Sequence, residues 1–342
     1  MIIVMHVDAT PEQIEAVAAA IRTQGVEPLV LPGEGRVAIG IPAALSGDQR
    51  DHIETLVNGL EGVNQVTQTS RPYKLASREF HREPTIVEVR GVRIGQGTFH
   101  MFGGPCSIES YDQLARCAEV MVRCGAKLLR GGAFKPRTSP YAFQGHGEEA
   151  LRIMNRVGAE FDLVTITEAM SPEQVPMVAQ YADIIQIGAR SMQNFPLLIE
   201  AGRSMKPVFL KRGPSASIDD FLLAAEYVLA QGNPQVMLCE RGIVSIDKGY
   251  TRNTLDLAAV PVLKEYSHLP VIVDPSHGTG KARYVAPMAK AAVVAGADGV
   301  MVEMHPSPHE ALSDGSQALT IPQFESLCAD LRRLTEFVGV SA

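Results

Sequence analysis

From residue 100 onward the sequence repeats one pattern eight times: a short apolar run, a polar loop and an amphipathic segment. The apolar runs are "FHMFGGP", "AKLLRGG", "FDLVTITE", "ADIIQIGA", "KPVFLKRG", "QVMLCERG", "LPVIVDPS" and "ADGVMVEMH". Short apolar strands that alternate with helices indicate a parallel sheet that is buried on both faces. Eight such units in roughly 250 residues predict an α/β fold, a (β/α)8 TIM barrel, with its active site at the carboxyl ends of the strands.

A doubly wound open sheet is the competing fold for the same alternation. Such a sheet usually carries a glycine-rich dinucleotide turn of the form GxGxxG after its first strand. The corresponding stretch here is "GGPCSIES", which does not fit that turn. The barrel is therefore the favoured fold.

Residues 1–70 follow a different order, strand–helix–strand–strand–helix–strand, which is typical of a ferredoxin-like α+β domain. The first helix is expected to start with Thr10 as N-cap, Pro11 in the first turn and Gln13 completing a capping box. The first hairpin is expected to turn near Gly33 to Gly35. We predict this small domain over 1–70, a linker and a hairpin over 71–98, and the barrel over 99–342.

Composition excludes several classes of partner. The formal net charge of −7 argues against nucleic acid or an anionic membrane surface as the main partner. No apolar run approaches the roughly twenty residues that span a bilayer. Asp8 interrupts the N-terminal apolar run too early for a signal peptide. Five cysteines, none in a CxxC pair, suggest a reduced, cytoplasmic chain.

Polar residues are expected to converge where the eight strands end. They are Cys106, Arg130, Lys135, Glu168, Arg190, Lys211, Arg212, Glu240, Arg241, Asp274, His277, Glu303 and His305. Five of the cations, Arg130, Lys135, Arg190, Lys211 and Arg241, would surround one pocket. Ion pairing around the rim with Glu168 and Glu240 is the alternative interpretation. Because so few carboxylates are present to neutralise the cations, an anionic ligand is favoured.

A second group of strand-end residues has the character of metal ligands. Cys106, His277, Glu303 and Asp314 together offer a sulfur, a nitrogen and two carboxylates. Such a mixed set suits one divalent ion of Mn, Fe, Co or Zn better than Mg or Ca. Cys106 follows a glycine–proline turn at a strand end, whereas the other four cysteines are interpreted as packing residues. His305 and His309 are alternative ligands.

These residues lie in motifs that resemble a known enzyme family. The motifs are "GPCSIES", "LRGGAFKPRTSPYAFQG", "IGARSMQNFPLL", "LKRG", "CERG", "DPSHGTG" and "VEMHP…ALSDGSQ". They resemble 3-deoxy-D-arabino-heptulosonate 7-phosphate (DAHP) synthase, the first enzyme of the shikimate pathway, over about residues 100–320. The ferredoxin-like pattern over the first 70 residues is similar to the extension of the short, type I-beta branch.

The resemblance implies a condensation of phosphoenolpyruvate with erythrose 4-phosphate. Cys106, His277, Glu303 and Asp314 match the family's metal ligands. Arg130, Lys135, Arg190, Lys211 and Arg241 match its phosphoenolpyruvate-binding cations, and Asp274 joins the substrate-binding set. Arg137 and Thr138, in the loop after Lys135, would meet erythrose 4-phosphate. Lys135, Glu168, Cys106 and His277 form the expected catalytic set. Glu168 would orient the attacking water, and Lys135 or a water on the metal would supply a proton.

The sequence leaves three rival functions open. A sister synthase makes 3-deoxy-D-manno-octulosonate 8-phosphate from arabinose 5-phosphate, but its loop contains Asn where this chain has Pro136-Arg137-Thr138. A Schiff-base aldolase would use Lys211 as its amine. A sugar-phosphate sensor without catalysis is the third possibility, and the full set of metal ligands weighs against it.

The N-terminal 70 residues contain no catalytic constellation of their own. Their expected role is oligomerisation, as a homotetramer or homodimer, or coverage of apolar barrel surface. The resemblance implies a sharper hypothesis, in which tyrosine or phenylalanine binds between these domains and closes them over a neighbouring barrel.

Overall fold

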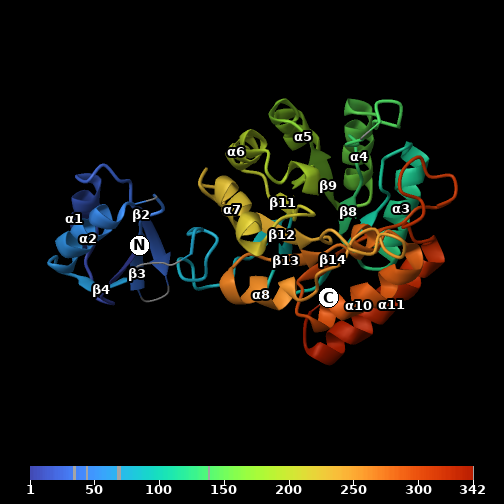
Figure 1. Cartoon of the computed structure of the whole chain (residues 1–342). Coiled ribbons are helices and arrows are strands. Elements are labelled where there is room, and N and C mark those ends of the chain that lie inside the picture. The colour runs from blue at the N-terminus through green and yellow to red at the C-terminus, as the bar shows by residue number, and fades with distance from the viewer. Residues whose placement is uncertain (34–35, 44, 68–70, 138, 342) are drawn as a thin grey trace. The chain divides into compact units, whose positions relative to one another are not determined.

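The computed structural model describes residues 1–33, 36–43, 45–67, 71–137 and 139–341. These residues form two compact units, Met1–Glu83 and Pro84–Ala342, each with its own core. Both are drawn by residue number in Figure 1. Within the described residues, no helix is long and apolar enough to cross a membrane.

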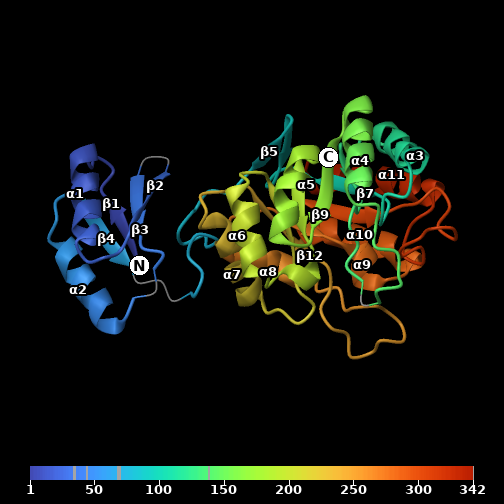
Figure 2. The same cartoon turned by 90° about the horizontal axis from the view of Figure 1, so that it is seen from above.

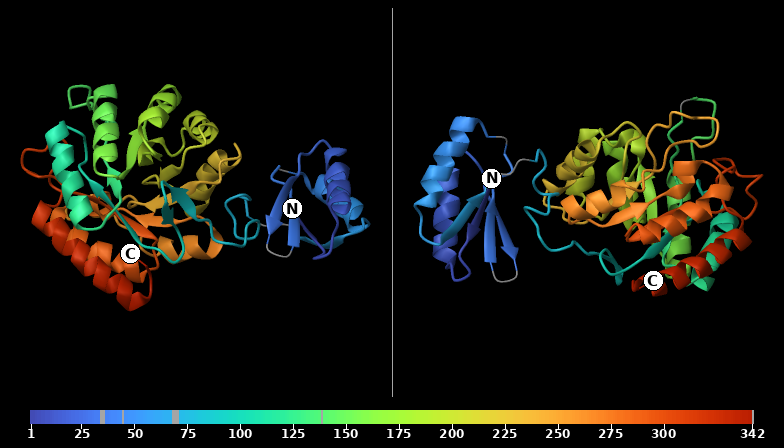
Figure 3. Two further views of the ribbon diagram at one scale, coloured as in Figure 1. Left: turned by 180° about the vertical axis from the view of Figure 1, so that it is seen from behind. Right: turned by 60° about the horizontal axis from the view of Figure 1, so that its bottom comes forward.

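The first unit contains a four-stranded antiparallel sheet and two helices. Its elements are β1 (Ile2–Met5), α1 (Pro11–Arg22), β2 (Leu29–Gly33), β3 (Arg36–Gly40), α2 (Gly47–Asn58) and β4 (Val63–Thr67). The strand order is β2-β3-β1-β4, and the two helices cover one face of the sheet (Figure 3). This arrangement confirms the predicted ferredoxin-like domain.

The start of α1 follows the predicted capping chemistry. The Gln13 backbone N–H donates to the Thr10 hydroxyl (3.3 Å), and the Thr10 N–H donates to the Gln13 side-chain oxygen (2.9 Å). Val17 and Ile21 on the inner face of α1 are fully buried. The predicted hairpin is formed by β2 and β3, but residues 34–35 of its turn lie outside the described residues.

The segment after β4 packs against the first unit. Tyr73, Ala76 and Phe80 are buried. The Phe80 ring lies so close to Gly40 that a Cβ there would come within 1.7 Å of it. The contacts therefore divide the chain between Glu83 and Pro84 rather than immediately after β4.

The second unit opens with a short hairpin and continues as a closed barrel. The hairpin strands are β5 (Val87–Val89) and β6 (Val92–Ile94), of which β5 is labelled in Figure 2. The barrel strands are β7 (His100–Gly104), β8 (Leu128–Arg130), β9 (Val164–Ala169), β10 (Ile184–Ile187), β11 (Val208–Lys211), β12 (Val236–Glu240), β13 (Val271–Val273) and β14 (Gly299–Glu303). All eight pair in parallel, and β14 closes on β7. The predicted barrel is confirmed.

Helices surround this barrel (Figure 1). They are α3 (Tyr111–Arg123), α4 (Glu148–Glu160), α5 (Val175–Tyr181), α6 (Phe195–Arg203), α7 (Ile218–Leu229), α8 (Ala259–Tyr266), α9 (Pro275–Thr279), α10 (Ala282–Val294) and α11 (Ile321–Val338). Two short 3-10 turns, Pro172–Gln174 and Ala189–Ser191, precede α5 and α6. Each helix sits between consecutive strands or after the last one, so every strand ends in a loop at the same face of the barrel.

The barrel interior is filled by apolar side chains. The rings of Phe102 and Phe209 lie 5.2 Å apart at its centre, and Met237 and Met301 belong to the same buried cluster. Hairpin residues such as Ile94 join this cluster. Because the interior is packed, ligands can reach the barrel only at its ends.

At the carboxyl end, β7 approaches β8 closely enough to require a glycine. Gly104 has a φ of +143°, and a Cβ at this position would lie 2.0 Å from the Arg130 carbonyl oxygen. Gly104 pairs with Glu303 across the β7–β14 seam. The seam thereby brings the end of β14 beside the loop that follows β7.

We predict that Gly104→Ala lowers the free energy of unfolding by about 2–3 kcal/mol, because alanine meets both a strained backbone conformation and the Arg130 carbonyl. Urea unfolding followed by circular dichroism measures the loss. Gly249→Ala is the control, since Gly249 has ordinary space around it and no positive φ. Equal stability of the two variants would contradict the close approach of β7 to β8 at Gly104.

Candidate active site

A cavity of about 240 Å³ opens at the carboxyl ends of the barrel strands. Its charged side chains are Arg130, Lys135, Arg137, Glu168, Arg190, Lys211, Arg241, Arg252 and Asp314, and His277 also lines it. Seven of these are cations and only two are carboxylates. Among the described residues, the loops of the barrel thus bring the predicted cations into one pocket.

Cys106 is buried and contacts two residues that line this cavity, Lys135 and Asp314. Its Sγ lies 3.0 Å from the Lys135 Nζ, 3.0 Å from the Ser313 Oγ and 3.4 Å from the nearer Asp314 oxygen. Burial raises the pKa of the Cys106 thiol to about 11, and the nearby Glu303 adds to that effect while Lys135 opposes it. The thiol is therefore held among polar groups.

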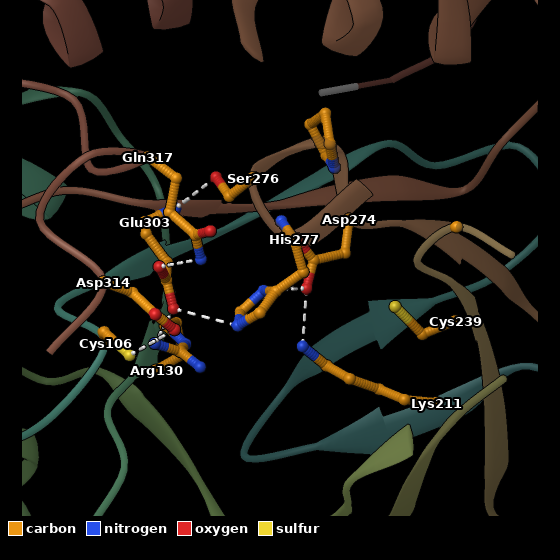
Figure 4. A network of polar contacts seen from close by, with 12 residues as sticks. Cys106, Arg130, Lys211, Cys239, Asp274, Ser276, His277, Glu303, Asp314 and Gln317 are labelled. Carbon is orange, nitrogen blue, oxygen red and sulfur yellow. Dashed lines mark hydrogen bonds and ion pairs between the residues drawn. The ribbon is translucent and has the colours of Figure 1, made fainter. Parts of the chain in front are cut away.

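Glu303, at the end of β14, is fully buried and fully engaged (Figure 4). One carboxylate oxygen accepts from the Arg130 Nη1 at 3.0 Å and lies 3.3 Å from the His277 Nε2. The other accepts from the Gln317 Nε2 at 2.7 Å. Burial alone would raise the pKa of Glu303, but His277 and Arg130 outweigh it and lower that pKa.

Asp274 connects two further predicted residues. Its Oδ2 accepts a hydrogen bond from the Lys211 Nζ at 2.5 Å and lies 2.7 Å from the His277 Nδ1 (Figure 4). Although burial opposes its charge, His277 and Lys211 hold the pKa of Asp274 well below its usual range. The carboxylate thus fixes the His277 ring with its Nε2 directed at Glu303.

Three of the four predicted metal ligands come together. The ligand atoms of Cys106, Glu303 and Asp314 lie within 4.8 Å of one another. His277 is outside that group but contacts it through Glu303 at 3.3 Å. Thiol, carboxylate and imidazole donors in one place fit a divalent transition metal or zinc.

The two alternative histidines do not join this group. The His305 Nε2 lies 3.3 Å from the Glu109 carboxylate, and its Nδ1 accepts from the Ser307 backbone N–H at 3.0 Å. His309 is exposed, with 81% of its side chain accessible. Neither ring is arranged as a ligand of the cluster.

Ion pairing holds for three of the predicted strand-end cations but not for the pocket as a whole. Arg130 pairs with Glu303 at 3.0 Å, and Lys211 pairs with Asp274 at 2.5 Å. Arg212 pairs with Glu240 and with Asp256, both at 2.9 Å, and does not line the cavity. Arg241 lines it and has no hydrogen bond or ion pair within the described part of the chain. Glu168, expected to pair with a cation, instead accepts from the Gln186 amide at 3.0 Å.

The loop after β8 brings Arg137 to the cavity. Arg137 donates through Nε to the Phe143 carbonyl (3.0 Å) and through Nη2 to the Ser313 hydroxyl. Arg190 donates to the Pro136 carbonyl in the same loop. Thr138, the other residue predicted to meet a sugar phosphate, lies outside the described residues.

Sequence reasoning missed two residues that organise the site. Gln317 donates to Glu303, and its side-chain oxygen accepts from the Arg252 Nη1 at 3.2 Å. Arg252 also lies 3.5 Å from the Asp314 carboxylate. Gln317 was visible in the motif "ALSDGSQ", three residues after Asp314, but the loop that brings Arg252 here carries no comparable signal.

Comparison with known proteins agrees with this geometry. Residues 70–338 match the model of the DAHP synthetase I family, and residues 1–71 match the DAHP synthase ferredoxin-like domain. The chain belongs to the DAHP synthetase I family. It is therefore an enzyme of the transferase type that this family comprises.

Some similar proteins match nearly the whole chain, and others match about 70% of it. A phospho-2-dehydro-3-deoxyheptonate aldolase of Thermotoga maritima is 44% identical over 340 residues, covering 99% of both chains. The crystal structure of the Thermotoga maritima DAHP synthase superposes with a TM-score of 0.79 at 43% identity, covering 99% of this chain and 98% of that one. A 2-dehydro-3-deoxyphosphooctonate aldolase of Syntrophobacter fumaroxidans is 35% identical, over 71% of this chain and 90% of its own length.

We predict that Gln317→Leu lowers the free energy of unfolding by about 1–3 kcal/mol, because it leaves a buried Glu303 oxygen without its donor. The measurement is urea unfolding in the presence of a chelator, so that no metal contributes. Gln96→Leu, at an exposed glutamine, provides the control. A loss no larger than that of the control would show that Gln317 does not support Glu303.

Proposed function

We propose that this enzyme condenses phosphoenolpyruvate with D-erythrose 4-phosphate and water to give DAHP and inorganic phosphate. The observation that carries the proposal is the cation-rich cavity beside a cluster of thiol and carboxylate groups. Membership of the DAHP synthetase I family, over both units of the chain, supports the same reaction.

The charge of the cavity favours two phosphorylated substrates. Seven cations and two carboxylates line it. Even when the buried partners Glu303 and Asp274 are counted against Arg130 and Lys211, cations predominate. Several partly buried cations close together lower the stability of the fold unless negative charges lie beside them. The phosphate and carboxylate of phosphoenolpyruvate and the phosphate of erythrose 4-phosphate would supply these negative charges. The cations would in turn offset the repulsion between the two substrates.

One divalent metal ion, of Mn, Fe, Co or Zn, is proposed as cofactor. Cys106, Glu303 and Asp314 would hold it together with His277, whose ring is already oriented by Asp274. When bound there, the metal supplies Lewis acidity that polarises the aldehyde of the aldose.

The protein groups provide binding and proton transfer. Carbon 3 of phosphoenolpyruvate attacks the aldehyde, water adds to the phosphate-bearing carbon, and phosphate leaves with cleavage of the C–O bond. The Lys135 ammonium donates to both the Cys106 carbonyl and its thiol, and we assign it the proton delivered to the new alkoxide. Glu168, oriented by Gln186, would position the attacking water. Arg130, Arg190, Lys211 and Arg241 would bind phosphoenolpyruvate.

The two rival enzymes receive less support. Lys211 is paired with the fully buried Asp274, and an ammonium in such a pair is a poor nucleophile for a Schiff base. The octulosonate synthases share the barrel but match only 71% of this chain in the case of the Syntrophobacter protein. The loop Pro136-Arg137-Thr138 and the DAHP synthase ferredoxin-like domain favour the four-carbon aldose.

Phosphate release with each aldose phosphate tests the proposal. We expect release from phosphoenolpyruvate with erythrose 4-phosphate, and loss of that release after chelation with recovery on adding a divalent metal. Arabinose 5-phosphate should be a poor substrate. A preference for arabinose 5-phosphate, or full activity in chelator, would overturn the assignment.

We predict that Cys106→Ser abolishes metal-dependent turnover and lowers metal content while leaving the fold intact. A thiolate forms a stronger, softer bond to these metals than a hydroxyl does. Turnover, bound metal and circular dichroism are the readouts. Cys117→Ser, at a buried cysteine away from the cavity, is the control. Retention of activity and metal by Cys106→Ser would mean that Cys106 only packs.

We predict that Arg137→Ala raises the KM for erythrose 4-phosphate far more than the KM for phosphoenolpyruvate. The loss of one charge-assisted phosphate contact should cost about 1.5–3 kcal/mol. Steady-state kinetics with each substrate varied in turn measures both constants. Equal effects on the two would show that this loop serves the other ligand.

The first unit is proposed to regulate the barrel. Tyrosine or phenylalanine would bind between first units of a homotetramer or homodimer in the cytoplasm and favour closure over a neighbouring barrel. An effector needs to prefer the closed state by only ~1–3 kcal/mol. The solved truncated form of the Thermotoga maritima synthase covers 78% of this chain with a TM-score of 0.73, which supports a barrel that folds alone.

A chain that starts at Pro84, the first residue of the second unit, should keep condensation activity and lose inhibition by tyrosine or phenylalanine. Phosphate release at millimolar effector concentration compares it with the full chain. If the full chain is itself indifferent to both amino acids, this regulatory role is wrong and the first unit serves assembly alone.

A further inference from the structure

Two cysteines lie together at the opposite end of the barrel from the active site. Cys124 is the C-cap of α3, and Cys328 lies on α11. Both line a cavity of about 530 Å³, which also borders His100 at the start of β7 and Val164 at the start of β9. This cavity is larger than the one at the carboxyl ends, and the proposed reaction does not use it.

Contacts on both sides of the cysteines set α11 against the end of α3. The Arg123 Nη2 lies 2.7 Å from the Glu325 carboxylate, and the Arg332 Nη2 donates to the Cys124 carbonyl at 2.8 Å. Residues spaced three and four apart lie on one face of a helix, so Cys328 sits on α11 between Glu325 and Arg332. The Cys328 thiol donates to the Met101 Sδ at 3.2 Å. Cys124 and Cys328 line the same cavity, and each thiol shifts the pKa of the other.

The pair also differs from the other cysteines in its accessibility. Cys106, Cys117 and Cys239 are buried, whereas Cys124 and Cys328 are both partly exposed. The Cys328 thiol lowers the pKa of Cys124 against the opposing effect of burial, and the Arg123 and Arg332 guanidinium groups add to the lowering. Cys124 is thus the thiol of the pair that ionises more readily, and ionised thiols are the reactive ones.

We propose that Cys124 and Cys328 form a reversible intrachain disulfide that fastens α11 to α3. The co-reactant is a small-molecule disulfide. The Cys124 thiolate attacks one of its sulfurs and expels one small thiolate, giving a mixed disulfide. The Cys328 thiolate, after losing its proton to solvent, attacks the Cys124 sulfur and expels the second. The protein dithiol is oxidised, and one small disulfide is reduced to two small thiols.

The disulfide would stabilise the part of the barrel where the C-terminal helix packs near the first strand. The chain after α11 returns to the start of β7, where the Phe99 N–H donates to the Ser341 carbonyl at 2.7 Å. A bond between α3 and α11 closes a loop of roughly two hundred residues, so it should reduce the entropy of the unfolded chain substantially. The oxidised protein should therefore be the more heat-resistant form, with an unchanged fold.

The full chain, equilibrated with mixtures of reduced and oxidised glutathione and then alkylated, tests the proposal. Peptide mapping should find Cys124 and Cys328 joined and lighter by two hydrogen atoms. Reduction should restore both thiols. The melting temperature should rise by roughly 5–15 °C on oxidation. Cys124→Ser and Cys328→Ser should each abolish that rise, and Cys117→Ser should retain it.

Three results would overturn the disulfide. They are a glutathione adduct on Cys124 without a cross-link, a bond between two chains instead of within one, and a wild-type melting temperature that does not respond to oxidation. Peptide mapping of the wild-type chain decides the first two even if a serine variant fails to fold.

Discussion

The arrangement of the site depends on a carboxylate that has no contact with water. Glu303 is fully buried at the end of β14, and an unpaired charge there would be strongly destabilising. Arg130 from β8 neutralises its charge, and Gln317 from the loop before α11 donates a hydrogen bond to its other oxygen. His277, which follows β13, also contacts it. Each partner comes from a different strand or loop. The carboxylate therefore fixes the relative positions of the loops that carry the proposed metal ligands.

The same constraint separates two kinds of cation at the strand ends. Arg130 and Lys211 have buried carboxylate partners, Glu303 and Asp274, that belong to the fold. Arg241 has no such partner within the described residues, even though only 8% of it is exposed to solvent. Burial lowers the pKa of Arg241, which is the signature of a charge that lacks compensation. Arg241 is therefore a nearly buried cation in the cavity without a carboxylate partner among the described residues, as the proposed binding of an anionic substrate requires.

Most of the site residues could be predicted from the sequence, because the carboxyl ends of all eight parallel strands lie at one face of a barrel. Once eight parallel strands are recognised, residues such as Cys106 and Glu303 must lie at the same rim. The sequence could not tell Arg212 from Arg241, because the difference depends on whether Asp256, sixteen residues after Glu240, folds back to pair with Arg212.

Side chains that reach the site from long loops were equally out of reach for sequence reasoning. Arg252 reaches Gln317 and Asp314 only through the path of the loop between β12 and α8. No periodicity records such a path. For His305 the sequence instead suggested a role that the structure does not support. Its position at a strand end predicted a metal ligand, but its Nε2 lies 3.3 Å from the Glu109 carboxylate of another loop.

The proposed reaction requires one rim of the barrel to hold both a metal and the anionic substrate. A crystal structure of the protein soaked with Mn²⁺ and phosphoenolpyruvate, with anomalous scattering recorded for manganese, tests it most directly. We expect an anomalous peak within bonding distance of Cys106 and Asp314, and the phosphate of phosphoenolpyruvate on Arg241. Manganese bound elsewhere, or phosphoenolpyruvate absent from the cation-lined cavity, would contradict it.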